Sequence, residues 1–279
     1  MYAISGQRSI GATAPSSVAQ APATAPRRGT DAPDGDLFGN TLSGPSPRTS
    51  GGEASDWWLP GPARLCIATG AVAVEVRKRR FAALPPIAII GPTDRAHRIV
   101  ATGGGVVSVA ITPLGWSRLS RRAASGFRNL VAPADDVLRP ALALALADHV
   151  HAGGALCGPA LHDRLAPLTS AHRDEAQLLA LAALVRDPAS VQVRDLHDRL
   201  GISEARLRSL ALRHFGSPAK ILLRRARFLR SLAQVDFRAG HHSYADIDPS
   251  YHDVPHFLRD AHYFLGTTPR RFRLLSSQH

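Results

Sequence analysis

The spacing of apolar residues changes along the chain and separates regions of different expected structure. From Trp57, short apolar runs such as AVAVEV and GVVSVAIT alternate with Gly and Pro, which is typical of β-strands joined by turns. After Pro113, and throughout the chain from Val191, apolar residues recur at helical spacing. We therefore predict an α+β protein, with a mixed α/β sensing or dimerisation domain over residues 57–188 and an all-α domain over residues 189–279.

The first 56 residues show neither the strand pattern nor the helical pattern. Residues 1–56 are rich in Ala, Gly, Pro, Ser and Thr, and Tyr2 and Phe38 are their only aromatic residues. Such a composition buries too little apolar surface to offset the entropy of ordering. We expect residues 1–56 to form a disordered extension.

Several kinds of protein are disfavoured by composition. No apolar run approaches the roughly 18 residues of a membrane span, and the N-terminus MYAISGQRSI lacks the basic start and apolar segment of a secretory signal. Cys66 and Cys157 are the only cysteines, too few for a disulfide scaffold or a cysteine zinc site. The sequence predicts a cytoplasmic protein with no membrane partner.

The segment VRDLHDRLGISEARLRSLALRHFG has the pattern of a helix-turn-helix, in which two short helices meet at a tight turn. Leu196 and Leu200 lie on one face of the first helix, Gly201 supplies the turn, and Ser203 occupies the N-cap of the second helix. Helical spacing turns the apolar residues of the second helix, such as Leu207, inward. Its exposed faces then carry Ala205, Arg206, Arg208, Ser209 and Arg213. Such a helix can lie in the major groove of DNA, although a plain helical hairpin with a solvated arginine face fits this segment equally well.

The core positions of this segment return 50 residues further along the chain. Leu207, Ala211, Phe215 and Gly216 correspond to Phe257, Ala261, Leu265 and Gly266. Both glycines suit helix C-caps, and Pro218 and Pro269 suit the first turn of the next helix. The intervening SPAKILLRRARFLRSLAQV predicts a connector helix. We therefore predict two helix-turn-helix units joined by a connector helix, able to enter successive major grooves about 34–36 Å apart.

The charge of the chain favours a nucleic-acid partner. The net charge is +12, and all but two of the 34 basic residues are arginine, whose planar fork suits phosphates and base edges. Residues 191–279 hold 15 basic and 8 acidic residues, so the excess is densest there. The connector arginines, which are Arg224, Arg225, Arg227 and Arg230, contact phosphates or form a solvated or salt-bridged helix face.

The stretch YHDVPHFLRD is close to the H-E-x-x-H zinc signature but is better explained as the start of a helix. Pro255 lies between His252 and His256, and proline is accepted only in the first turn of a helix. A helix that begins after Asp253, with Asp253 as its N-cap, places His252 outside the helical face of His256. The sequence therefore predicts no metal site and no cofactor.

These residues together resemble the DNA-binding domain of AraC/XylS-type transcription regulators. The resemblance is carried by residues 191–275, and more weakly by the region from residue 57 onward. In its most specific part, the family run aromatic-x-D-Q-x-H-F-x-R, followed by G-x-T-P-x-x-F/Y-R, is matched by Tyr251, Asp253, His256, Phe257, Arg259, Gly266, Thr268, Pro269, Phe272 and Arg273. Two departures stand out: Ser250 replaces a glycine, and Val254-Pro255 replaces a glutamine and a small residue.

The resemblance implies a sequence-specific DNA-binding transcription regulator that is not an enzyme. The base-facing positions of the family fall on Ala205, Arg208 and Ser209 in the first unit and on Val254, Pro255, His256 and Arg259 in the second. Double-stranded DNA is the expected partner, and the class leaves open a small-molecule effector and a homodimer.

Three other classes remain open from the sequence. A DNA-repair or alkyl-transfer protein can carry the same helical domain, but needs a reactive cysteine. A metal-dependent hydrolase would be centred on His252 and His256. A nonspecific nucleic-acid binder would show a steep salt dependence without preference for one site.

Overall fold

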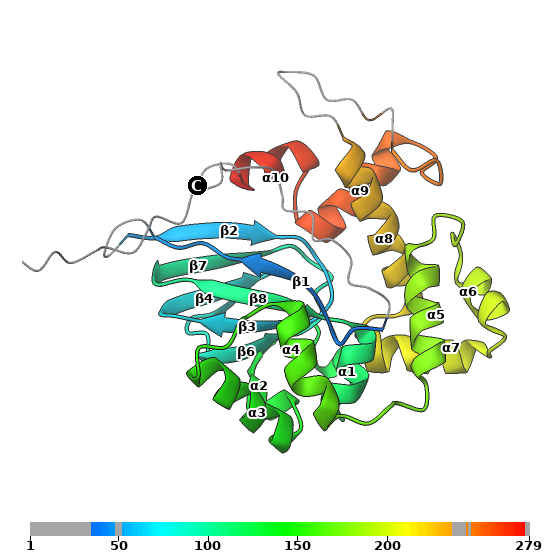
Figure 1. Cartoon of the computed structure of the whole chain (residues 1–279). Coiled ribbons are helices and arrows are strands. Elements are labelled where there is room, and N and C mark those ends of the chain that lie inside the picture. The colour runs from blue at the N-terminus through cyan, green and yellow to red at the C-terminus, as the bar shows by residue number, and fades with distance from the viewer. Residues whose placement is uncertain (1–34, 48–51, 236–243, 245–246, 277–279) are drawn as a thin grey trace, which may run out of the picture.

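The computed structural model describes residues 35–47, 52–235, 244 and 247–276. An antiparallel β-sheet region comes first and a helical region follows (Figure 1), which confirms the expected α+β class. The strands are β1 (Phe38–Ser43), β2 (Ala54–Trp58), β3 (Arg64–Ala68), β4 (Ala71–Val76), β5 (Arg79–Phe81), β6 (Ile87–Ile90), β7 (His97–Gly103), β8 (Val106–Ile111) and β9 (Val131–Pro133).

The helices lie beside and after the strands. The α-helices are α1 (Pro113–Leu119), α2 (Ala134–Val137), α3 (Pro140–His151), α4 (Gly158–Leu165), α5 (Glu175–Arg186), α6 (Val193–Leu200), α7 (Glu204–Leu210), α8 (Ala219–Gln234), α9 (Val254–Leu265) and α10 (Pro269–Ser276). Two short 3-10 helices, η1 (Ala124–Phe127) and η2 (Ala166–Leu168), and one π-helix, η3 (Ala211–Phe215), complete the described elements.

The strands form two sheets, with the orders β1-β8-β3-β6-β9 and β2-β7-β4-β5. Side chains alternate between the two faces of a strand, and β3 buries both faces. Leu65 and Ile67 pack in the core that α1 to α4 cover, whereas Cys66 packs between the sheets. Burial raises the pKa of the Cys66 thiol to about 12, so the thiol stays protonated at neutral pH. Cys66 is thus a buried strand residue and lacks the thiolate that alkyl transfer needs.

The prediction that residues 1–56 form a disordered extension is wrong for two segments. Phe38–Ser43 is strand β1, paired with β8, and Ala54–Asp56 belongs to β2, paired with β7. Phe38 is only 2% exposed. The apolar surface that orders β1 comes from β8 and the helices, so the composition of residues 1–56 alone does not reveal it. Residues 1–34 lie outside the described residues.

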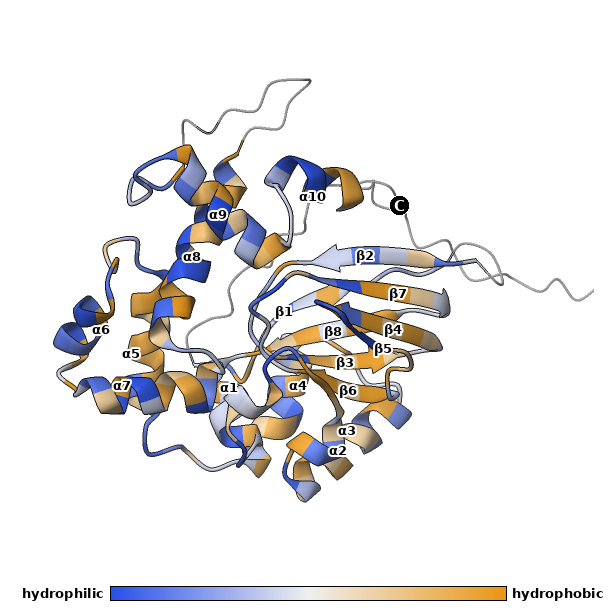
Figure 2. Cartoon of the chain, turned by 180° about the vertical axis from the view of Figure 1, so that it is seen from behind, coloured by the Kyte–Doolittle hydropathy of each residue, from blue (hydrophilic) through white to orange (hydrophobic). Residues whose placement is uncertain are grey.

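The predicted boundary between residues 188 and 189 also needs correction. Leu178, Leu181 and Leu184 of α5 pack in one core with Leu196 of α6 and Leu207 of α7. Figure 2 shows the apolar colouring of α5 against the polar colouring of α6. Because α5 supplies an apolar face that the first helix-turn-helix needs for burial, it belongs structurally with the helical region.

The second helical unit packs against the strand region. The Ala96 N–H donates a hydrogen bond to the Phe264 carbonyl at 2.7 Å, and the rings of Trp57 and Phe272 meet edge to face at 5.8 Å. The Arg225 guanidinium of α8 donates hydrogen bonds to carbonyl oxygens of the strand region, those of Gly61 and Thr93, at 3.1 Å each. The strand region therefore sets the position of α8, α9 and α10.

No helix among the described residues is both long and apolar enough to cross a membrane.

Acid is expected to weaken the strand region through His97. His97 is 2% exposed beside the Trp58 ring, and burial lowers the pKa of its imidazole from 6.5 to about 4. The unfolded chain therefore binds a proton that the folded chain does not, and stability is lost as the pH falls from about 6.5 towards 4. Chemical denaturation at several pH values measures this loss.

A His97→Leu variant is expected to lose less stability than the wild type over that pH range, whatever its absolute stability. The control is His151→Leu, because His151 is exposed at the end of α3. Identical pH slopes for the wild type and His97→Leu would contradict the assignment.

Candidate nucleic-acid interface

The first helix-turn-helix has the predicted form. Helix α6 ends at Gly201, whose φ of 61° places it in the left-handed region that favours glycine. Ser203 caps α7 by accepting a hydrogen bond from the Arg206 N–H at 3.2 Å. Leu196, Leu207, Leu210 and Ala211 are at most 1% exposed, whereas Leu200 is half-buried. The apolar pattern therefore correctly predicted the buried face of α7.

The outward face of α7 carries most of the residues expected to contact DNA. Ala205, Arg208 and Ser209 are exposed on α7, and Arg213 is exposed on η3. Arg206 is the exception. Its guanidinium pairs with Asp174 at 2.5 Å and donates hydrogen bonds to the Gln177 side chain at 3.0 and 3.2 Å. The Arg206 side chain is 34% exposed, but its guanidinium is engaged by an acidic residue before α5 and does not point away from the protein as Arg208 does.

The helix expected to be the second recognition helix, α9, also begins where predicted. Asp253 caps α9 by accepting a hydrogen bond from the His256 N–H at 2.6 Å, and Pro255 lies in the first turn. Helix α9 ends at Gly266, which has a φ of 78°, and Pro269 opens α10. Pro218 stands one residue earlier than predicted, at the N-cap of α8.

The first helix of the second unit is not seen. The repeat would place it in the segment that precedes Tyr251, and most of residues 236–246 lie outside the described residues. Residues 247–253 are described and form turns and coil instead of a helix. The second unit is therefore shown only for α9 and α10.

One face of α9 is buried and the other is open. Phe257 and Ala261 are fully buried, whereas Pro255 and Arg259 are exposed and Val254 and His256 are half-buried. The His256 ring lies 5.0 Å from the Tyr251 ring and 6.0 Å from the His252 ring. Desolvation, and then the charge of Arg227, lowers the pKa of His256. A neutral imidazole can both donate and accept a hydrogen bond. His256 can therefore bond to either a donor or an acceptor group on the edge of a base.

The connector arginines are structural. Asp260 of α9 is 2% exposed at its side chain and pairs with Arg224 at 2.5 Å and with Arg227 at 3.3 Å. It also accepts a hydrogen bond from the Tyr251 hydroxyl at 2.8 Å. Arg230 pairs with Asp248 at 2.9 Å. Arg224, Arg227 and Arg230 are therefore salt-bridged, whereas Arg225 instead bonds to carbonyl oxygens of the strand region.

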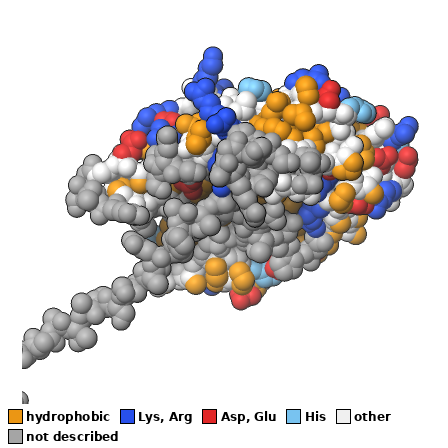
Figure 3. Space-filling view, turned by 90° about the horizontal axis from the view of Figure 1, so that it is seen from above, with side chains coloured by type: hydrophobic (Ala, Val, Ile, Leu, Met, Phe, Trp, Pro, Cys, Tyr) orange, Lys and Arg blue, Asp and Glu red, His pale blue; other side chains and the backbone are white. Residues whose placement is uncertain are grey.

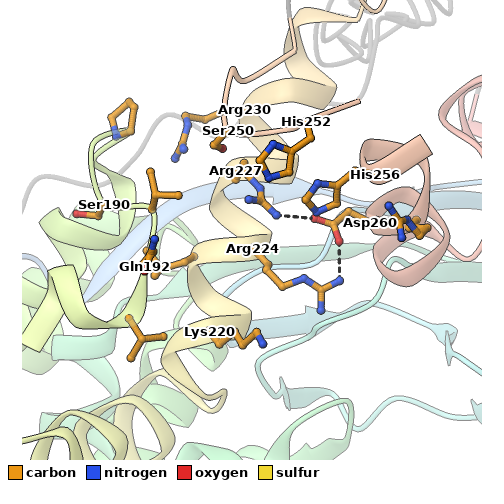
Figure 4. A pocket seen from close by; sticks show the side chains of 15 residues that line it. Ser190, Gln192, Lys220, Arg224, Arg227, Arg230, Ser250, His252, His256 and Asp260 are labelled. Carbon is orange, nitrogen blue, oxygen red and sulfur yellow. Dashed lines mark hydrogen bonds and ion pairs between the residues drawn. The ribbon is translucent and has the colours of Figure 1, made fainter. Parts of the chain in front are cut away.

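A groove of about 830 Å³ separates the two units. Figure 4 shows its walls: the segment before and at the start of α6, the connector α8, and the start of α9. Lys220 and Arg259 line the groove and are exposed at its rim. On the face seen in Figure 3, Lys and Arg side chains stand in several separate groups. Gln192 also lines the groove. Neither Lys220 nor Gln192 belongs to a motif in the sequence, although Lys220 is one of only two lysines in the chain.

The histidines of the second unit do not form a three-residue metal site. His252 and His256 also line the groove, but the Asp253 carboxylate between them is engaged as the cap of α9. Among the described residues, the one group of three metal-ligating side chains is His172, Asp174 and His214, far along the chain from this stretch. The hydrolase centred on His252 and His256 therefore gains no support.

Comparisons with protein-family models and with curated proteins gave no match. Two solved structures of ToxT from Vibrio cholerae, one of them an apo variant, are similar to this chain, each with a TM-score of 0.43. The apo variant is 11% identical and is matched over 86% of this chain and 98% of its own. The other is 12% identical and is matched over 87% and 99%.

Proposed function

We propose that this protein is a sequence-specific DNA-binding transcription regulator of the AraC type. The observation that carries the proposal is the repeated arrangement of α7 and α9, each capped by a side chain, buried on one face and open on the other. The connector helix α8 lies between them in the described part of the chain. Paired recognition helices of this kind suit successive major grooves of double-stranded DNA.

In this proposal, different residues on the open faces of α7 and α9 make different kinds of contact with DNA. Arg208 and Arg259 carry the bidentate donors that read guanine, and His256 reads a base edge. Val254 and Pro255 offer apolar contact, for example with a thymine methyl group. Ala205 and Ser209 lie beside Arg208 and complete the contact of α7, and Arg213 lies near a phosphate.

In this proposal the strand region controls the helical region. The hydrogen bonds of Ala96 and Arg225 couple its loops to α8 and α9. A small-molecule effector or a second copy of the chain that alters the strand region would thereby shift the second recognition helix relative to the first.

Arg208→Ala and Arg259→Ala are each expected to weaken binding to the cognate site by about 1–3 kcal/mol and to relax one base position. The site is first selected from random DNA with the purified wild type, and two sequence motifs about one helical turn apart are expected. Fluorescence anisotropy then measures the affinity of each variant for that site and for random DNA. Selection with each variant shows which base position is relaxed.

The matched control is Arg121→Ala, which removes the same charge from an exposed position outside the helical region. Its affinity for the selected site should remain close to that of the wild type. Equal losses on the selected site and on random DNA would show that Arg208 and Arg259 contact the backbone and not the bases. Failure to select any motif would contradict the proposed function.

A further inference from the structure

Three potential metal ligands meet where α5 contacts the first recognition helix. His172 precedes α5, Asp174 is the N-cap residue of α5, and His214 lies on η3. One ligand atom from each of the three lies within 4.8 Å of the other two. The His172 and His214 rings are 5.0 Å apart and meet edge to face.

His214 has ring nitrogens that are available to a ligand. His214 is only 4% exposed, and neither ring nitrogen has a hydrogen-bond partner in the described part of the chain. Buried polar atoms are nearly always paired, and an unpaired one carries a desolvation penalty. A ligand that accepted a lone pair from this imidazole would offset that penalty.

The backbone around His214 supports the same interpretation. Residues Ala211–Phe215 form a π-helix at the end of α7, and single π-turns within helices are rare and frequent at functional sites. Ala211 and Phe215 are buried on either side of His214. His214 follows Leu207 by seven residues and shares its buried face.

We propose that His172, Asp174 and His214 bind one divalent transition-metal ion of the zinc type. Two imidazoles and one carboxylate are a common zinc ligand set, and three protein ligands leave a fourth position for water. With Zn–N distances of about 2.0–2.1 Å, ligand atoms on a tetrahedral ion lie about 3.4 Å apart. The present separations need to close by at most about 1.4 Å, which side-chain rotation supplies.

The ion would compete with Arg206. Asp174 is the one anionic ligand of the three, and it pairs with the Arg206 guanidinium at 2.5 Å. An ion that took the Asp174 carboxylate would remove this ion pair and leave the Arg206 guanidinium held to α5 only by the neutral Gln177 side chain. Arg206 would then be able to turn towards the open face of α7, beside Arg208 and Ser209. If the proposed function holds, the ion thereby adds a cation to the DNA-contacting face and strengthens DNA binding.

Metal binding is tested on the full chain without DNA. After treatment with a chelator, Zn²⁺ is titrated by calorimetry, and Co²⁺ binding is followed by visible absorption. The wild type is expected to bind one ion at this site and to melt at a higher temperature when it is bound. His172→Gln and Asp174→Asn are each expected to lower the affinity at least about tenfold.

His252→Gln is the matched control, because His252 is an exposed histidine that lies beside His256 and away from the proposed site. The ion affinity of this variant should equal that of the wild type. His172 is half-buried in a loop, so His172→Gln keeps the test valid if a change at the more buried Asp174 impairs folding. Equal Zn²⁺ affinities in the wild type, His172→Gln and Asp174→Asn would overturn the site.

The coupling is tested separately, with the DNA site selected by the wild type. Zn²⁺ is expected to raise the affinity for that site about fivefold or more, and the increase should vanish in Asp174→Asn. Zn²⁺ binding with no change in DNA affinity would overturn the coupling and leave the metal site intact. Absence of specific DNA binding with or without Zn²⁺ would instead contradict the proposed function, which the calorimetry does not depend on.

Discussion

Asp260→Ala is expected to lower the free energy of unfolding by about 2–3 kcal/mol, because it deletes a buried carboxylate and leaves the half-buried Arg224 and Arg227 without their shared partner. The Asp260 carboxylate pairs with both Arg224 and Arg227 of α8 and accepts a hydrogen bond from Tyr251. All of these contacts cross from α9 to the connector or to the segment before α9. Urea denaturation followed by circular dichroism measures the change.

The matched control is Asp163→Ala, which removes an exposed aspartate from the surface of α4. That change should stay within about 0.5 kcal/mol of the wild type. Asp260 fixes α9 on the connector α8. The Asp260→Ala variant should therefore also bind the selected DNA site more weakly, although the contacts of α7 with DNA should persist. A stability loss below about 1 kcal/mol would show that solvent screens these ion pairs.

Phe228→Ala is expected to destabilise the protein by about 3–5 kcal/mol, the usual effect of deleting a large buried aromatic side chain. The Phe228 ring is fully buried in α8 and stacks on Phe257 at 5.6 Å and on Phe264 at 5.1 Å. Because these three rings form the interface between the connector and α9, their neighbours cannot close the cavity without moving α9. Thermal and urea denaturation together quantify the loss.

Leu274→Ala in α10 is the control, because this leucine is 57% exposed and its truncation opens no cavity. Its stability should lie within about 0.5 kcal/mol of the wild type. Equal destabilisation by Phe228→Ala and Leu274→Ala would contradict the assignment of Phe228 to the core of the second unit.

Local features of the recognition helices could be predicted from the sequence because short-range chemistry decides them. Asp253 and Ser203 cap helices because their side chains reach the N–H groups three residues later. Gly201 and Gly266 end helices because they adopt positive φ without steric strain. The leucines of α7 point inward because helical periodicity places them on one face.

The direction of long charged side chains could not be predicted in the same way. Arg206 and Arg208 are two residues apart on one helix, yet Arg206 reaches Asp174 and Arg208 stays exposed. The partners of Arg224 and Arg227 lie more than 30 residues away along the chain. A flexible cationic side chain takes its position from the nearest acid in space, and sequence spacing does not contain that information.

The sequence by itself determined the α+β class, the capped recognition helices and their repeat, because caps, glycines and apolar spacing act within a few residues. Only the tertiary structure decided that β1 joins the sheet, that α5 belongs with the first unit, and that His172, Asp174 and His214 meet. Each of these depends on surfaces brought together by packing between distant segments. Whether the ring nitrogens of His214 are hydrogen-bonded also depends on the side chains that pack around it and exclude water, and these come from distant parts of the chain.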